Sequence, residues 1–155
     1  MRKFTVYIFF ILCGFQYPAN AQSLIANSPL DNENDVKQVI QNMFIAMKQS
    51  DTILLKSCFS DKVIFQTVVN KQDGAVVKTE SIQDFIKSIG KQTANSLDEI
   101  IEFGQINIDP LIATVWTPYT FYFKGNYSHK GVNSFQLVKL KEGWKIQYLI
   151  DTRYK

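Results

Sequence analysis

The 155-residue sequence carries 17 basic and 14 acidic residues, for a net charge of +3. This length suits one domain with a core of its own, and so small a charge excludes the basic footprint of a nucleic-acid-binding protein. One histidine and two distant cysteines match no zinc spacing, and the sequence has neither a phosphate loop nor a dinucleotide glycine fingerprint. We therefore expect no metal and no cofactor.

The N-terminus is typical of a secretory signal peptide. Arg2 and Lys3 precede an apolar run over residues 4–15, and Ala19-Asn20-Ala21 forms an A-x-A cleavage site. The run is shorter than the roughly 20 apolar residues of a membrane-spanning helix, although an uncleaved anchor is the alternative. We expect residues 1–21 to be removed and the protein to be exported, either to the periplasm or as a secreted protein, without a membrane anchor. Cys58 then stands alone, and we interpret it as a small buried hydrophobe.

Residues 22–34 are polar and irregular and predict a flexible lead-in, followed by one domain over residues 35–155. Its first helix follows from apolar residues at helical spacing between Val36 and Met47, with Asn32 or Asn34 as its cap. Asp51 predicts the cap of a short second helix. A strand over 62–69, the turn Asp73-Gly74 and a return over 75–79 predict a hairpin. Ser81 begins a third helix, which Gly90 ends as a C′ glycine would.

From Leu97 onward the apolar period is two, which predicts strands over about 97–108, 111–123, 127–140 and 144–153. The joints between them are short turns, which connect antiparallel neighbours. Because the helices are the available cover for one face of this sheet, the sequence predicts an α+β fold. In it a curved antiparallel sheet wraps around about three helices, and its open end forms a pocket.

The order of elements resembles the nuclear transport factor 2-like fold, which SnoaL-type cyclases and ketosteroid isomerase share. The C-terminal third resembles most closely the SnoaL-like, or putative lumazine-binding, branch. The segments that carry this resemblance are Ala113-Thr114-Val115-Trp116-Thr117-Pro118-Tyr119, Ser128-His129-Lys130-Gly131-Val132-Asn133-Ser134-Phe135, Gly143-Trp144-Lys145-Ile146 and Asp151-Thr152-Arg153. The resemblance implies a cone-shaped domain and, by the name of the branch, a pteridine-like ligand. It does not fix a function, because the fold hosts isomerases, cyclases, dehydratases and binding proteins.

The last strands supply the candidate catalytic residues. His129 can act as an acid or base near neutral pH, and Asp151 is its expected partner across the sheet. The alternative for His129 is an ordinary rim histidine. Arg153 is a candidate ligand-binding residue. It shares a face with Asp151 at i and i+2, so a local ion pair is the alternative for both.

Ligand-binding residues are expected on the same faces. Alternation places His129, Asn133 and Phe135 on one side of their strand, where polar groups give way to apolar ones. Trp116 and Tyr119 are candidates for stacking on a ligand, and core packing is their alternative. These two have opposite parity, so we expect Pro118 to mark a bulge where the parity resets.

The sequence therefore favours a module that binds a small hydrophobic or aromatic ligand. The alternatives are a small enzyme that performs proton transfer, isomerisation or dehydration, and a homodimeric module that associates through the outer face of its sheet.

Overall fold

The computed structural model describes residues 29–155. The expected signal peptide and the lead-in up to residue 28 lie outside this range. Three helices are present in it: α1 (Pro29–Gln49), α2 (Thr52–Ser57) and α3 (Ile82–Ile89). None of them is long and apolar enough to cross a membrane. Helix α1 begins at Pro29, a residue type that suits a first helical turn, so the expectation that residues 29–34 are irregular was wrong.

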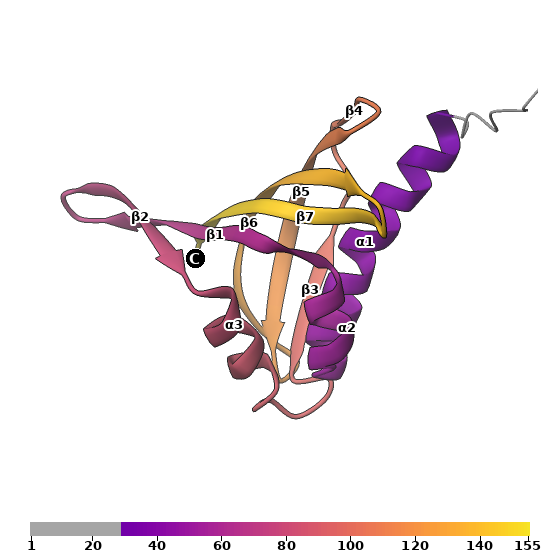
Figure 1. The fold of residues 1–155 in the computed structure, drawn as a ribbon. Helices are drawn as coiled ribbons and strands as arrows, with labels where there is room; N and C mark the ends of the chain where they lie inside the picture. The colour runs from indigo at the N-terminus through magenta and orange to yellow at the C-terminus, as the bar shows by residue number, and fades with distance from the viewer. Residues whose placement is uncertain (1–28) are drawn as a thin grey trace, which may run out of the picture.

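Within residues 29–155, seven strands form one sheet. They are β1 (Phe59–Lys71), β2 (Gly74–Glu80), β3 (Leu97–Ile101), β4 (Ile106–Ile108), β5 (Ile112–Phe123), β6 (Asn126–Leu140) and β7 (Gly143–Tyr154). The strand order is β2-β1-β7-β6-β5-β3, and β4 pairs with β5 beside β3. Figure 1 shows the sheet curving over the three helices, with the β1–β2 hairpin projecting away from them.

The sheet is mixed rather than antiparallel throughout. Strand β1 runs parallel to β7, and all other pairings are antiparallel. The short turns correctly predicted the antiparallel order of β5, β6 and β7. They carried no information on β1, because a parallel neighbour is reached by a long crossover rather than by a turn.

The predicted strand over 97–108 divides into β3 and β4. Ile101 pairs with Tyr119 and Ile106 pairs with Val115, so the β3–β4 side carries one extra residue. Trp116 lies opposite this irregularity, because its carbonyl accepts from the Gly104 N–H at 2.8 Å and its own N–H donates to the Gln105 carbonyl at 3.0 Å. Pro118 is still in regular register, and its carbonyl accepts from the Glu102 N–H at 3.0 Å. The bulge is therefore on the partner strand, and the parity of β5 does not reset at Pro118 as we had expected.

The core lies between the sheet and α1. The predicted stripe on α1 is buried at Val36, Ile40, Met43, Phe44 and Met47. Its partners on the sheet are Val115, Phe135, Leu137 and Ile146, all of them almost fully buried. The ring of Phe44 meets the ring of Phe135 edge to face, with centroids 6.2 Å apart.

The short helices are held by their caps. The Asp51 side chain accepts hydrogen bonds from the backbone N–H groups of Ile53 and Leu54, and Ser81 accepts from Asp84. Gly90 ends α3 as predicted, but its φ of −62° is right-handed and not that of a C′ glycine. Its lack of a side chain matters for packing instead, since a Cβ there would lie 2.8 Å from Thr52. These contacts hold the ends of α2 and α3 and pack the two helices against each other.

Candidate functional site

A cavity of about 200 Å³ lies between α3, the end of α1 and the concave face of the sheet. Four strands and two helices contribute to it, and we call it the Asp151 cavity. Its lining residues are Met47, Phe85, Ser88, Ile89, Gln92, Leu97, Glu99, Tyr119, Phe121, His129, Asp151 and Arg153. Aromatic and aliphatic walls thus surround a group of polar and ionisable side chains.

Asp151 is the most constrained ionisable group of the cavity. It is 5% exposed, and its carboxylate accepts hydrogen bonds from the Thr67 hydroxyl and from Nε of Arg153 at 2.9 Å. Arg153 also donates to Thr67 Oγ1 at 3.2 Å. The local ion pair expected for Asp151 and Arg153 is therefore present. Since these bonds hold the carboxylate in place, Asp151 serves better as an anchor than as a mobile base.

Thr67 reaches Asp151 because β1 runs parallel to β7, where the two residues are direct partners in the register. No local sequence pattern indicates this contact, since it depends on a pairing between residues 84 positions apart. The first and last strands of the domain thus meet at the cavity wall.

Tyr119 is fixed over a glycine. Its hydroxyl donates to the carbonyl of Thr152 at 2.9 Å and lies 3.3 Å from Oδ2 of Asp151. Its register partner on β6 is Gly131, and a Cβ added there would lie 2.8 Å from the Tyr119 ring. Burial, and then the charge of Asp151, raises the pKa of Tyr119 well above its usual value. Tyr119 is therefore a neutral hydrogen-bonding group at physiological pH.

Glu99 is a functional candidate that our sequence analysis missed. Asn133, which is 4% exposed, donates from Nδ2 to Oε1 of Glu99 at 2.9 Å. Burial is the largest effect on Glu99 and raises its pKa to about 7. A signal was present in the sequence: alternation puts Glu99 on the same face as Leu97 and Ile101, so an acidic residue stands among inward-facing apolar ones.

His129 lies at the cavity wall and is partly buried. Its ring is 5.0 Å from the ring of Phe121 and 5.7 Å from that of Tyr119, and its Nδ1 is 3.0 Å from the Ser128 hydroxyl. Burial, and then the nearby charge of Arg153, lowers the pKa of His129 below its usual value. The structure brings His129 and Asp151 to one cavity, but each forms its hydrogen bonds with other groups.

The remaining predicted site residues lie elsewhere. Phe135 is fully buried in the core beneath the sheet. Trp116 points to the outer face, where it is 50% exposed and lines a separate hollow with Gln105 and Asn107. Because β5 keeps its parity, Trp116 and Tyr119 lie on opposite faces of the sheet. Of the seven predicted residues, the cavity is lined by His129, Asp151, Tyr119 and Arg153, with Asn133 bound to Glu99 behind it.

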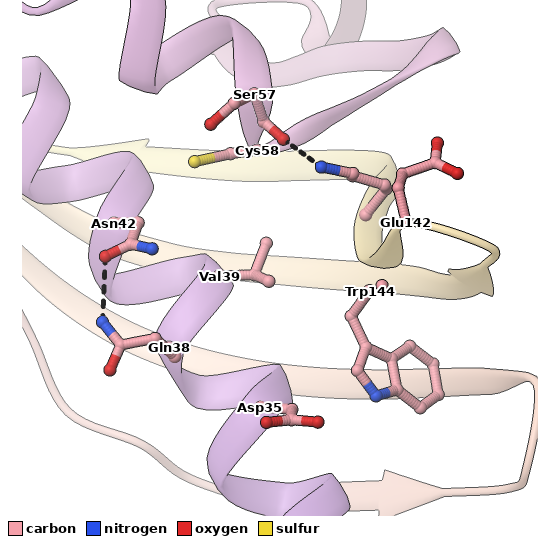
Figure 2. A pocket seen from close by; sticks show the side chains of 10 residues that line it. Asp35, Gln38, Val39, Asn42, Ser57, Cys58, Glu142 and Trp144 are labelled. Atoms are coloured by element: carbon pink, nitrogen blue, oxygen red, sulfur yellow. Dashed lines mark hydrogen bonds between the residues drawn. The ribbon is translucent and has the colours of Figure 1, made fainter.

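Two other hollows are less suited to chemistry. One, of about 310 Å³, lies between α1, the end of α2 and the β6–β7 turn, and Figure 2 shows its lining residues. Several of its polar groups already bind protein atoms: Gln38 donates to Asn42 at 2.9 Å, and Lys145 donates to the Ser57 carbonyl at 2.6 Å. The other, of about 580 Å³, lies between α2, α3 and the start of β1. Exposed lysines stand at its edge, and Phe59, Ile82 and Ile86 form its apolar base.

Within residues 29–155, no group of three or more histidine, cysteine, aspartate or glutamate side chains is arranged to hold a metal ion.

No protein-family model matches the sequence, and no curated protein matches it. Solved structures match the fold. An NTF2-like protein of unknown function from Shewanella baltica OS155 superposes with a TM-score of 0.63 at 14% identity, over 83% of this chain and 98% of that one. A domain of unknown function with a cystatin-like fold from Nostoc punctiforme PCC 73102 gives a TM-score of 0.64 at 16% identity, over 80% and 78% of the two chains. An NTF2-like protein with a cystatin-like fold from Novosphingobium aromaticivorans gives 0.62 at 12% identity, over 81% and 84%.

These similarities confirm the predicted fold class. Residues 29–155 form an α+β domain with the NTF2-like, cystatin-like fold, and its curved sheet covers three helices. The assignment to the SnoaL-like or lumazine-binding branch stays a prediction.

Proposed function

We propose that this NTF2-like domain binds a small molecule in the Asp151 cavity. The observation that carries the proposal is the convergence of ionisable and hydrogen-bonding side chains from β3, β5, β6 and β7 on one hollow with aromatic walls. Ligand sites combine an apolar lining with a few fixed polar groups in this way.

The energetic cost of this arrangement supports the proposal. A carboxylate held away from water needs several donors to offset its desolvation, and replacing such a group by apolar side chains often leaves stability unchanged or improves it. Asp151, Glu99 and Asn133 are all placed on inward faces, where apolar residues would pack at no such cost. A function that needs polar groups beneath the curved sheet accounts for the presence of these three residues.

The experiment is an NMR fragment screen on the purified domain, in which amide shifts report where a probe binds. Hits should perturb residues around Phe121, His129 and Asp151. Ser88 is exposed at the cavity rim, so Ser88→Phe should block the hits without touching the polar groups. Trp116→Ala, on the opposite face, is the matched control and should leave binding unchanged. Hits that persist in Ser88→Phe and vanish in Trp116→Ala would place the ligand site on the other face.

A second candidate function is acid–base catalysis in the same cavity, and Glu99 is the observation that favours it. Its pKa of about 7 suits a group that takes up and returns a proton at neutral pH. Asp151, held by Thr67 and Arg153, would orient the site, and His129 would assist as a neutral imidazole. Enolisable ketones incubated with the protein in D2O test this: deuterium incorporation that depends on Glu99 supports an enzyme, and no incorporation with any ketone leaves a binding protein.

A further inference from the structure

The Asp151 cavity is lined by two carboxyl groups, Glu99 and Asp151, and by one cationic side chain, Arg153. Arg153 and Asp151 neutralise each other through their 2.9 Å ion pair. His129 has its pKa lowered and is neutral at physiological pH, and Tyr119 keeps its proton. Glu99 is thus the one ionisable group of the cavity lining whose negative charge no cation pairs with directly.

We propose that the Asp151 cavity selects a weakly basic, planar aromatic ligand whose ring N–H donates to the free oxygen of Glu99. This inference rests on the proposed binding function and names the chemical class of the ligand. The ligand would carry one proton-accepting ring nitrogen, as imidazole-like and aminopyridine-like rings do.

The hydrogen bonds of Glu99 leave a place for this donor. Asn133 donates to Oε1, and within residues 29–155 no protein group donates to Oε2. A carboxylate accepts hydrogen bonds at both oxygens. A ligand N–H at Oε2 would therefore give Glu99 a donor on each oxygen, with Asn133 on the other. Asn133 also fixes the orientation of the carboxyl, because the amide itself is buried.

The walls suit a flat ring of limited size. The ring centroids of Phe121 and His129 are 5.0 Å apart, and Phe85 of α3 lines the same cavity. A volume of about 200 Å³ lies below the usual range for drug-sized ligands. One fused bicyclic ring is therefore the largest ligand expected without rearrangement. A cationic ring would also gain from the faces of the aromatic side chains.

An anionic ligand is disfavoured by the same groups. It would meet two carboxyl groups, and Arg153, the cation of the cavity, is already bonded to Asp151. A like charge placed against an unpaired carboxylate costs free energy that a neutral or cationic ring avoids.

The test uses three probes of similar size: benzimidazole as the weak base, benzoate as the anion and benzofuran as the neutral ring. Affinities are measured by NMR titration for the wild type and for Glu99→Gln. Benzimidazole should bind the wild type at least about tenfold more tightly than benzoate does, and Glu99→Gln should remove that preference. Benzofuran should bind both proteins equally, which shows that the cavity of the variant is intact.

The pH profile gives an independent readout. The complex of a neutral base with protonated Glu99 has the same total number of protons as the complex of a protonated base with ionised Glu99. Either complex loses affinity when the pH adds a proton to the free base or removes one from free Glu99. Binding of benzimidazole should therefore reach a maximum between the pKa of the probe and that of Glu99. In Glu99→Gln the upper limb of this profile should disappear.

Two outcomes overturn the inference in different ways. If benzoate binds more tightly than benzimidazole and loses affinity in Arg153→Gln, the cavity is a ligand site but it selects anions. If none of the three probes binds, both the ligand class and the proposed binding function fail.

Discussion

The Asn133 side chain donates a 2.9 Å hydrogen bond to Glu99, and this bond joins β6 to β3 across the strand between them. Glu99 is thereby fixed on the concave face. It lines the same cavity as Asp151, although the two residues are 52 positions apart in the sequence. The two carboxyl groups differ in environment. Asp151 is anchored by donors on both oxygens, whereas Glu99 has one donor and its raised pKa leaves it free to exchange a proton near neutral pH.

Glu99 should make the domain less stable as pH rises. Its folded-state pKa of about 7 lies above the ordinary value of 4.5, so between these values the unfolded chain releases the proton that the folded state keeps. The free energy of unfolding should fall across this window, by at most about 3 kcal/mol, and level off above it. Urea denaturation from pH 4.5 to 8 measures the slope.

Glu99→Gln is the control, because it cannot titrate yet keeps an oxygen for Asn133. The variant should lack this part of the decline, and its stability relative to the wild type should rise with pH. An identical slope in both proteins would mean that Glu99 is ionised at its ordinary pKa.

Phe135 and Phe121 should separate stability from binding. Phe135 is fully buried, so Phe135→Ala should cost about 3–5 kcal/mol of unfolding free energy. Phe121 is only partly buried and lines the Asp151 cavity, so Phe121→Ala should cost less and weaken ligand binding instead. Chemical denaturation and probe titration of both variants check this contrast. Equal losses of stability would show that Phe121 belongs to the core.

The fold and half of the site follow from local patterns. The alternation along β6 and the i, i+2 pair Asp151 and Arg153 are properties of single strands, and both hold in the structure. Thr67 reaches Asp151 only through the parallel pairing of β1 with β7, which no local pattern encodes. Alternation puts Glu99 on the inward face, but its bond to Asn133 depends on the order of β3, β5 and β6 in the sheet. Trp116 was assigned to the wrong face because the extra residue lies on the β3–β4 side, opposite Trp116, and not in β5 at Pro118.

Cys58 should be inert in the folded protein. It is 3% exposed, its Sγ lies 3.3 Å from the Leu54 carbonyl, and burial raises the pKa of its thiol to about 11. The thiolate is the reactive form, so a thiol reagent at pH 8 should label Cys58 only as fast as the domain opens. Labelling should be complete at once in concentrated urea. Rapid labelling without denaturant would contradict the buried position.

Trp116 tests the homodimer alternative. It lies on the outer face of the sheet with other large exposed apolar side chains, among them Ile100 and Ile112. If the protein associates through this face, Trp116→Glu should give a monomer, because a carboxylate would be buried at the contact. Light scattering of the wild type and variant measures the mass of each. A monomeric wild type at high concentration would remove the alternative.

Two buried threonines should respond in opposite ways to the same substitution. Thr67 and Thr117 both lie on inward faces of strands, but Thr67 donates to Asp151, whereas the Thr117 hydroxyl has no hydrogen-bond partner within residues 29–155. Thr67→Val should cost about 2 kcal/mol, since it removes a bond to a buried charge and a partner of Arg153. Thr117→Val keeps the shape, removes an unpaired buried hydroxyl and should leave stability unchanged or raise it by about 1 kcal/mol. Urea denaturation of both variants at one pH decides the matter, and a large loss in Thr117→Val would mean that its hydroxyl is bonded in solution.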